Sequence, residues 1–281
     1  MKKSVLVSAV FLGCVLLFGA TVRAADTVPF EQMPAPATKE QLRKAQRETK
    51  PVDKENPAMP LEIRRDAMRE AALSYGARGG LAWRTYHIRK EMETRARYMD
   101  KVFDFRQLLI AAPSGLLIEP PIIAESMDAM QIENGGQNAA VADRVYNIGR
   151  NARIVSTARN WRIYLERQWG DVAPPPDLLL PTTREDQKKW DEWFDEGWDA
   201  GIEQADEIFQ ADLNKLTADY QGMVRYRTLL AQGMVSPPYA LQVDRGVTGG
   251  GNEMRVGDRA VSITGQAALQ TETEEWSPAS R

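Results

Sequence analysis

The stretch that decides the fold runs from Thr183 to Gly233 and reads TREDQKKWDEWFDEGWDAGIEQADEIFQADLNKLTADYQGMVRYRTLLAQG. Its apolar residues return every three or four positions, which is the spacing of a helix with one face against a core. Thr183 stands three residues before Asp186, and a threonine followed by an acid at that distance is typical of a helix start. The pattern therefore predicts one long helical region.

Four aromatic residues gather on this predicted helix, namely Trp190, Trp193, Phe194 and Trp198. They lie within a little over two helical turns and alternate with acidic residues, so they form a broad apolar face. Packing into the protein core is one interpretation of this face. Tryptophan is also enriched at protein interfaces, so the same four residues are our candidate for a surface that binds a partner.

Another helical pattern lies earlier in the chain and begins at about Leu61. The stretch SYGARGG, from Ser74 to Gly80, interrupts the apolar spacing with three glycines. The spacing then resumes in LAWRTYHIRKEMETRARYMDKVFDF and continues to Phe105. We therefore expect two helical segments with a break between them.

Two other regions change to the alternating pattern of β-strands. In AMQIENGGQNAAVADRVYNI, two alternating arms surround Asn134-Gly135-Gly136, and glycine permits the positive φ of a tight hairpin turn. YALQVDRGVTGGGNEMRVGDRAVSITG has the same character around Gly249, Gly250 and Gly251. A phosphate-binding loop is a weaker interpretation of the second stretch, because it lacks the Lys-Ser/Thr ending of that motif. Each region predicts a β-hairpin.

The two hairpin regions share four features in the same order, which suggests a duplicated helix-hairpin unit. Paired prolines end a helix and force an extended approach to the next strand. The shared features are an aromatic-Arg-x-Leu-Leu helix end (Phe105, Tyr226), a proline pair (Pro120 and Pro121, Pro237 and Pro238), a glycine turn and an Asp-Arg pair (Asp143 and Arg144, Asp258 and Arg259). The predicted fold class is α+β, mainly helical, with two small β-hairpin regions.

The first residues have the three parts of a bacterial export signal, with Lys2 and Lys3 before an apolar run and small residues after it. Cleavage between Ala24 and Ala25 gives a signal of residues 1–24. Gly13-Cys14 permits a lipoprotein signal of residues 1–13, with lipid on Cys14, the one cysteine of the chain. An uncleaved membrane anchor is a third alternative. The mature protein is predicted to work outside the cytoplasm.

The remaining boundaries follow from composition. Residues 25–60 are rich in proline and charge, so we expect a tether, with a short helix at Lys39 to Glu48. Residues 61–265 form the predicted folded domain, and residues 266–281 form a polar, flexible tail.

The sequence offers no convincing site for chemistry. The net charge of -3 argues against nucleic-acid binding. His87 is the only histidine and lies among cations, and no Gly-x-Ser-x-Gly nucleophile motif occurs. Adjacent acids such as Glu185 and Asp186 leave open a cell-wall-acting enzyme, and a small-ligand-binding module is a further alternative. We predict no catalytic residue, no metal, no cofactor and no enzymatic activity.

Long motifs point to a family, among them ALSYGARGGLAWRTYHIR, FRQLLIAAPSGLLIEPPII, NARIVSTARNWRIYLERQWGDVAPPPDLL and GMVSPPYALQVDRGVTGGGNEMRVGDRAVSITG. They resemble the DotC/TraI family of type IVB secretion (Dot/Icm) and IncI-type conjugation systems. The resemblance implies a lipoprotein at the periplasmic face of the outer membrane that helps to build a multimeric core complex. It also implies a DotD-like lipoprotein, a DotH-like outer-membrane subunit, and DotF- and DotG-like subunits as partners.

Overall fold

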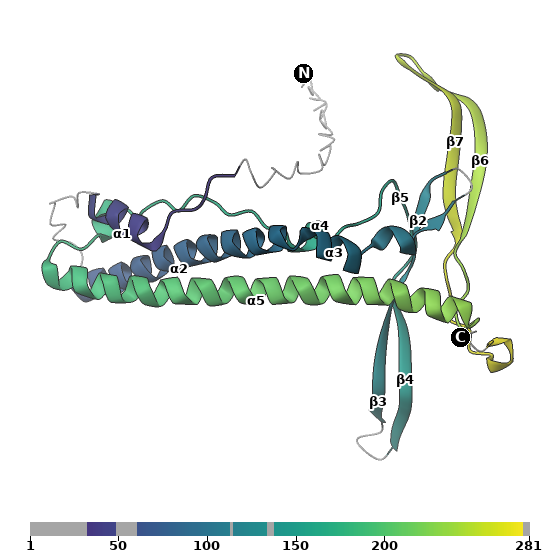
Figure 1. The fold of residues 1–281 in the computed structure, drawn as a ribbon, viewed down its shortest axis with the longest axis horizontal. Helices are drawn as coiled ribbons and strands as arrows, with labels where there is room; N and C mark the ends of the chain where they lie inside the picture. Colours follow the sequence, from purple (N-terminus) through teal and green to yellow (C-terminus); the bar gives the residue numbers. More distant parts are fainter. Residues whose placement is uncertain (1–32, 49–60, 113–114, 134–137, 278–281) are drawn as a thin grey trace, which may run out of the picture. The chain divides into compact units, whose positions relative to one another are not determined.

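The computed structural model describes residues 33–48, 61–112, 115–133 and 138–277. The chain separates into two units, Met1–Ala35 and Pro36–Arg281, and the described helices and strands all lie in the second. The predicted export signal, with Cys14, Ala24 and Ala25, and the turn of the first hairpin lie outside the described residues. The fold is α+β and mainly helical, as predicted (Figure 1).

Helix α5, Arg184–Ala231, is 48 residues long and confirms the predicted long helical region. At a rise of 1.5 Å per residue it extends for about 72 Å. The Thr183 hydroxyl caps its start by accepting a hydrogen bond from the Asp186 backbone N–H at 3.1 Å. The same hydroxyl donates to the Asp186 carboxylate at 2.8 Å. The cap satisfies an N–H group that has no partner inside the helix.

Helix α2, Leu61–Thr94, is continuous, so the predicted break at SYGARGG is wrong. The glycines there lie against α5, and α2 and α5 pack side by side (Figure 1). A Cβ on Gly80 would lie 2.1 Å from the carbonyl oxygen of Trp198, and one on Gly201 would lie 2.1 Å from that of Ala77. The glycines therefore let two helix backbones approach closely, and this contact outweighs their weak helix propensity.

The two long helices run parallel, because residues later in α2 contact residues later in α5. Gly197 of α5 lies against Leu73, whereas Gly201 lies against Ala77. Parallel neighbours need a long return connection, and residues 95–183 supply it. This connection contains α3 (Ala96–Val102), η2 (Phe105–Leu108), β1 (Ile110–Ala111), β2 (Leu117–Glu119), β3 (Ile122–Glu133), β4 (Asn138–Arg150), β5 (Arg153–Val155), α4 (Arg162–Leu165) and η4 (Asp177–Leu179). Strands β1, β2 and β5 form a small antiparallel sheet in the order β1-β2-β5.

Separate core clusters lie along α5. The first contains Tyr75, Trp190 and Phe194, the second contains Phe105, Trp161 and Leu216, and the third contains Ile123 and Tyr226. The aromatic residues in these clusters bury large apolar areas, which compensates for the absence of disulfides in this region.

Helix α1, Lys39–Glu48, has the bounds predicted from the sequence. It packs onto the body, whereas the sequence predicted a free tether. Leu42 is buried in the first core cluster, and its carbonyl accepts a hydrogen bond from the Tyr75 hydroxyl at 3.1 Å. Arg43 and Lys39 both pair with Asp195 of α5, at 2.5 Å and 2.8 Å. Residues 49–60 lie outside the described residues.

Both predicted hairpins are present as two-stranded antiparallel sheets, β3–β4 and β6–β7, where β6 is Tyr239–Gly250 and β7 is Glu253–Gly265. Each first strand has 12 residues and begins directly after its proline pair. Each second strand has 13 residues, and its sixth and seventh residues are the Asp-Arg pair. The two hairpins therefore match strand for strand, as the duplicated-unit hypothesis expects.

The last described residues pack against the end of α5, which differs from the predicted loose tail. Leu269 forms a β-bridge with Val235, and Ala267 is buried in the third core cluster. The Ser277 backbone N–H donates to the carbonyl of Gln232 at 2.9 Å. Short η5, Thr273–Glu275, lies between these contacts. A polar segment can dock in this way because its few apolar side chains and its backbone groups find partners.

Candidate interaction surfaces

The aromatic face of α5 belongs to the core, so it does not offer the predicted partner surface. Trp190, Phe194 and Trp198 are buried in the first cluster, and half-buried Trp193 packs against the same cluster. Phe194 packs with Tyr75 of α2 at a ring-centroid distance of 5.6 Å. The prediction of an interface is therefore wrong for the three buried residues, and core packing is the correct interpretation.

The β3–β4 hairpin carries exposed apolar side chains beyond its base. Met130 lies directly opposite Val141, and Ile132 is two residues further along β3 on the same face. All three are exposed, Val141 to 70%. Val145, also exposed, lies on the Val141 side of β4. Such a stripe is unusual on an isolated soluble protein and typical of a surface that binds another protein.

The β6–β7 hairpin has a second stripe of the same kind. Val247 pairs with Val256, and Met254 lies two residues from Val256 on the same face. Met254 is 72% exposed and Val256 74%. Leu241 and Val243, nearer the base, are exposed as well. The sequence pattern predicted both hairpins, but it did not predict that their apolar side chains are exposed. The available signal was the presence of apolar residues on both faces of a strand.

Each hairpin also presents unpaired strand edges. Within the described residues, β3 pairs with β4 alone and β6 pairs with β7 alone. A two-stranded ribbon is marginally stable in water, and a long exposed edge readily pairs with another strand. The hairpins are therefore the strongest candidates for assembly contacts in the described part of the chain.

The proline pairs directly precede β3 and β6, and Gly249, Gly250 and Gly251 lie at the turn of the second hairpin. Pro120 and Pro121 are fully buried, whereas Pro237 is exposed and Pro238 is half-buried. In the second turn, Gly249 has φ 121° and Gly251 has φ 63°, which only glycine adopts easily. Gly250 has no positive φ, so its position does not require glycine.

The two Asp-Arg pairs lie at the middle of their strands. Arg144 is 3.6 Å from Glu125 across the β3–β4 hairpin, while Asp143 is exposed. Asp258 accepts a hydrogen bond from the Thr248 hydroxyl at 2.8 Å. Arg259 is exposed and faces Asp244 in the β6–β7 register.

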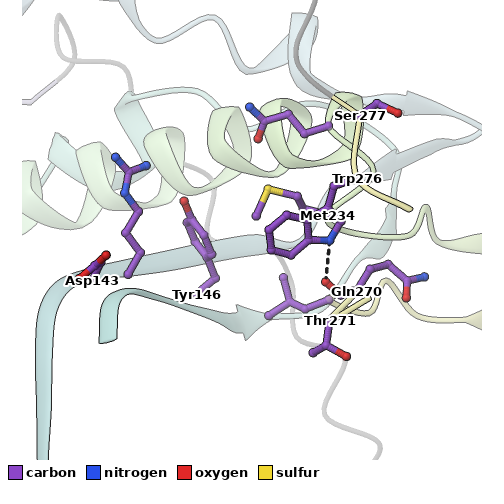
Figure 2. A pocket seen from close by; sticks show the side chains of 10 residues that line it. Asp143, Tyr146, Met234, Gln270, Thr271, Trp276 and Ser277 are labelled. Carbon is purple, nitrogen blue, oxygen red and sulfur yellow. Dashed lines mark hydrogen bonds between the residues drawn. The ribbon is translucent and has the colours of Figure 1, made fainter. Parts of the chain in front are cut away.

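A hollow of about 950 Å³ lies beside β4, between the end of α5 and the C-terminal segment. Figure 2 shows Asp143 and Tyr146 on one side of it and Met234, Trp276 and Gln270 on the other. The Trp276 indole N–H donates to the Gln270 carbonyl at 3.1 Å, which holds this wall in place. Smaller and adjoining, a hollow of about 450 Å³ shares Arg144, Tyr146 and Gln232 as lining residues. The hollow beside β4 therefore continues toward α5.

A buried ionic network fastens the return connection to α5. Arg159 donates to Asp219 at 2.8 Å and to both carboxylate oxygens of Glu119, which Arg153 also contacts at 3.1 Å. The Tyr164 hydroxyl donates to Asp219 at 2.7 Å. Burial, with the bond to Asp219, raises the pKa of Tyr164 to about 12. Every charge here has a partner, which is the condition under which buried ions are tolerated. The network is therefore part of the fold.

His87 lies on α2, with its ring 4.1 Å from that of Trp83. Burial, and then Lys90 and Arg84, lower its pKa. In the described ranges, no group of three or more His, Cys, Asp or Glu side chains could hold a metal ion. No helix among those same residues is long and apolar enough to cross a bilayer.

Comparison with known proteins identifies the family. No curated protein sequence matches the chain significantly. A family model described as type IV secretory system, conjugal DNA-protein transfer, matches residues 62–278. The match covers both long helices, the return connection, both hairpins and the docked C-terminal segment. The chain therefore belongs to the TraI family of the type IV secretory system.

Proposed function

We propose that this protein is a structural subunit of the outer-membrane core complex of a type IVB secretion or conjugation apparatus. It acts by binding other subunits and holding them at the periplasmic face of the outer membrane. The family places it in a type IV secretion system, where it works in a complex with other subunits. Its place in the outer-membrane core complex is our proposal, and so is a mechanism that involves binding without catalysis.

One observation carries this proposal, namely the two long hairpins with exposed apolar stripes and unpaired edges. A catalytic protein needs converging polar groups in a cleft, whereas a scaffold needs extended apolar surfaces and free strand edges. By the family resemblance, the proposed partners are a DotD-like lipoprotein and a DotH-like outer-membrane subunit, followed by DotF- and DotG-like subunits. Lipid on Cys14, or contact with these partners, would keep the protein at the membrane.

The test is retention of the DotH-like subunit in the outer-membrane fraction of a strain that lacks this protein. The unchanged chain is expected to restore retention and transfer of cargo. Val141→Asp with Val256→Asp places charge on both apolar stripes, so we expect both to be lost while the protein stays folded. Ile163→Asp is the matched control, because Ile163 is 65% exposed but lies on α4, away from the hairpins.

Two outcomes would contradict the proposal. Full retention by a folded Val141→Asp, Val256→Asp chain would show that the hairpins bind no partner needed for assembly. Equal loss in the Ile163→Asp control would show that exposed charge alone disturbs the protein.

Palmitate labelling of the unchanged chain, with the mass of its mature N-terminus, would decide between an anchor at Cys14 and cleavage between Ala24 and Ala25.

A further inference from the structure

We propose that neighbouring copies of this chain pair strand β4 of one copy with strand β7 of the next, in antiparallel register through their Asp-Arg pairs. The inference rests on the proposed assembly function and deepens it by naming a second copy as one partner. It arises from the two hairpins of a single chain, which have equal strand lengths and carry the Asp-Arg pair at the same positions.

Charge complementarity sets the register. When two Asp-Arg dipeptides meet in antiparallel strands, each aspartate faces the arginine of the other strand. Asp143 of one copy then faces Arg259 of the next, and Arg144 faces Asp258. Opposite charges at facing positions stabilise a strand pair, and like charges destabilise it. Both Asp143 and Arg259 are exposed, and neither takes part in an ion pair within the described part of the chain.

The same register places apolar residues opposite apolar residues. Val141, which is 70% exposed in a single chain, faces Val261. Ala142 faces Ala260, and both side chains are short. Pairing would therefore cover apolar area that one chain alone leaves in water, at about 25 cal/mol per Å².

A contact between β4 and β7 uses two different surfaces of one chain, so it is a head-to-tail contact. Such contacts give a ring when the rotation closes and an open fibre when it does not. Pairing of β4 with β4 alone would leave the β7 edge open, and pairing of β7 with β7 alone would leave the β4 edge open. One head-to-tail contact, repeated from copy to copy, covers both the β4 edge and the β7 edge of every chain.

Disulfide trapping tests the register. Ala142→Cys and Ala260→Cys are introduced together in the full chain, which is expressed with its own export signal but without other subunits of the apparatus. Oxidation is expected to give covalent dimers, trimers and higher multiples. The unchanged chain, whose one cysteine is Cys14, is the control for any native cross-link.

Each other outcome would overturn the proposal. Cross-linked dimers from either single cysteine variant would mean that like strands pair. Absence of cross-links in the double variant, while a maleimide labels both thiols, would mean that these edges do not meet. Because no partner subunit is present, failure here leaves retention of the DotH-like subunit as a separate readout of the proposed function.

Charge reversal tests the same contact without relying on disulfide geometry. The double cysteine chain for this test also carries Asp244→Asn, because Asp244 faces Arg259 within one chain. In it, Asp143→Arg alone and Arg259→Asp alone are each expected to abolish the cross-linked ladder, because like charges then face each other between copies. The combination Asp143→Arg with Arg259→Asp is expected to restore it. Asp143 and Arg259 lie on different hairpins, which do not pair with each other within one described chain. Restoration of the ladder would therefore report a contact between copies and not a contact inside one copy. A combined variant as weak as the single ones would refute the register.

Discussion

The close contact between α2 and α5 makes a sharp prediction about Gly201. An alanine there would place its Cβ 2.1 Å from the carbonyl oxygen of Ala77 and 2.8 Å from the backbone nitrogen of Leu81. Ordinary contact begins at about 3.4 Å, so the helices must separate locally by 3.4 minus 2.1, or about 1.3 Å. Both neighbouring atoms belong to the backbone of α2, so no side chain can rotate to make room.

The expected effect on the free energy of unfolding has two opposed parts. Over-packing costs about 3 kcal/mol where the structure cannot yield, since the facing groups lose contacts as the helices separate. Replacing glycine by alanine within a helix contributes about 1 kcal/mol of stability in the opposite direction. We therefore expect Gly201→Ala to lower the free energy of unfolding by about 2 kcal/mol.

Urea unfolding, followed by circular dichroism at the helix band, measures this difference. Gln204→Ala is the matched control, because Gln204 is exposed on the same helix three residues away. It should change stability by less than about 0.5 kcal/mol. A Gly201→Ala chain more stable than the parent would show that helix propensity dominates, and it would refute the close approach of the two backbones.

Three further predictions concern buried polar groups. Tyr226 is fully buried, and its hydroxyl has no hydrogen-bond partner among the described residues. In urea unfolding, Tyr226→Phe should therefore leave the free energy of unfolding unchanged or raise it by about 1 kcal/mol. A clear loss of stability would mean that the hydroxyl has a partner. Glu119→Ala leaves Arg159 without one of its buried counter-charges, so it should lower the free energy of unfolding by about 3–5 kcal/mol. Glu253→Ala, at an exposed ion pair, should lower it by less than about 1 kcal/mol. Equal losses for the two variants would contradict the buried network. His87 has a lowered pKa in the folded chain. Its contribution to stability is therefore complete above pH 6.5, the ordinary pKa of histidine, and is lost as the pH falls through the lowered folded-state pKa. Nuclear magnetic resonance titration of this one histidine should give a midpoint below 6.5, and a midpoint above that value would contradict its burial.

Local patterns in the sequence were sufficient for the elements themselves. Apolar spacing predicted α5, Thr183 and Asp186 marked its start, and α1 has its predicted bounds. Proline pairs and glycine turns located both hairpins, with the Asp-Arg pairs at matching positions. These signals succeed because a cap, a turn or an amphipathic face depends on residues a few positions apart.

The tertiary structure decided where each element meets another. Gly80 looks like a helix breaker in sequence, yet together with Gly201 it permits the parallel contact of α2 with α5. Trp190 and Phe194 could have faced a partner, but Tyr75 and Leu42 cover them. The C-terminal segment docks through Leu269 and Val235, whereas its composition suggested a free tail. Sequence by itself determined the helices, turns and apolar faces, since these arise from near neighbours. Only the fold determined which faces are buried and which hairpin edges stay open, because that depends on residues more than a hundred positions apart.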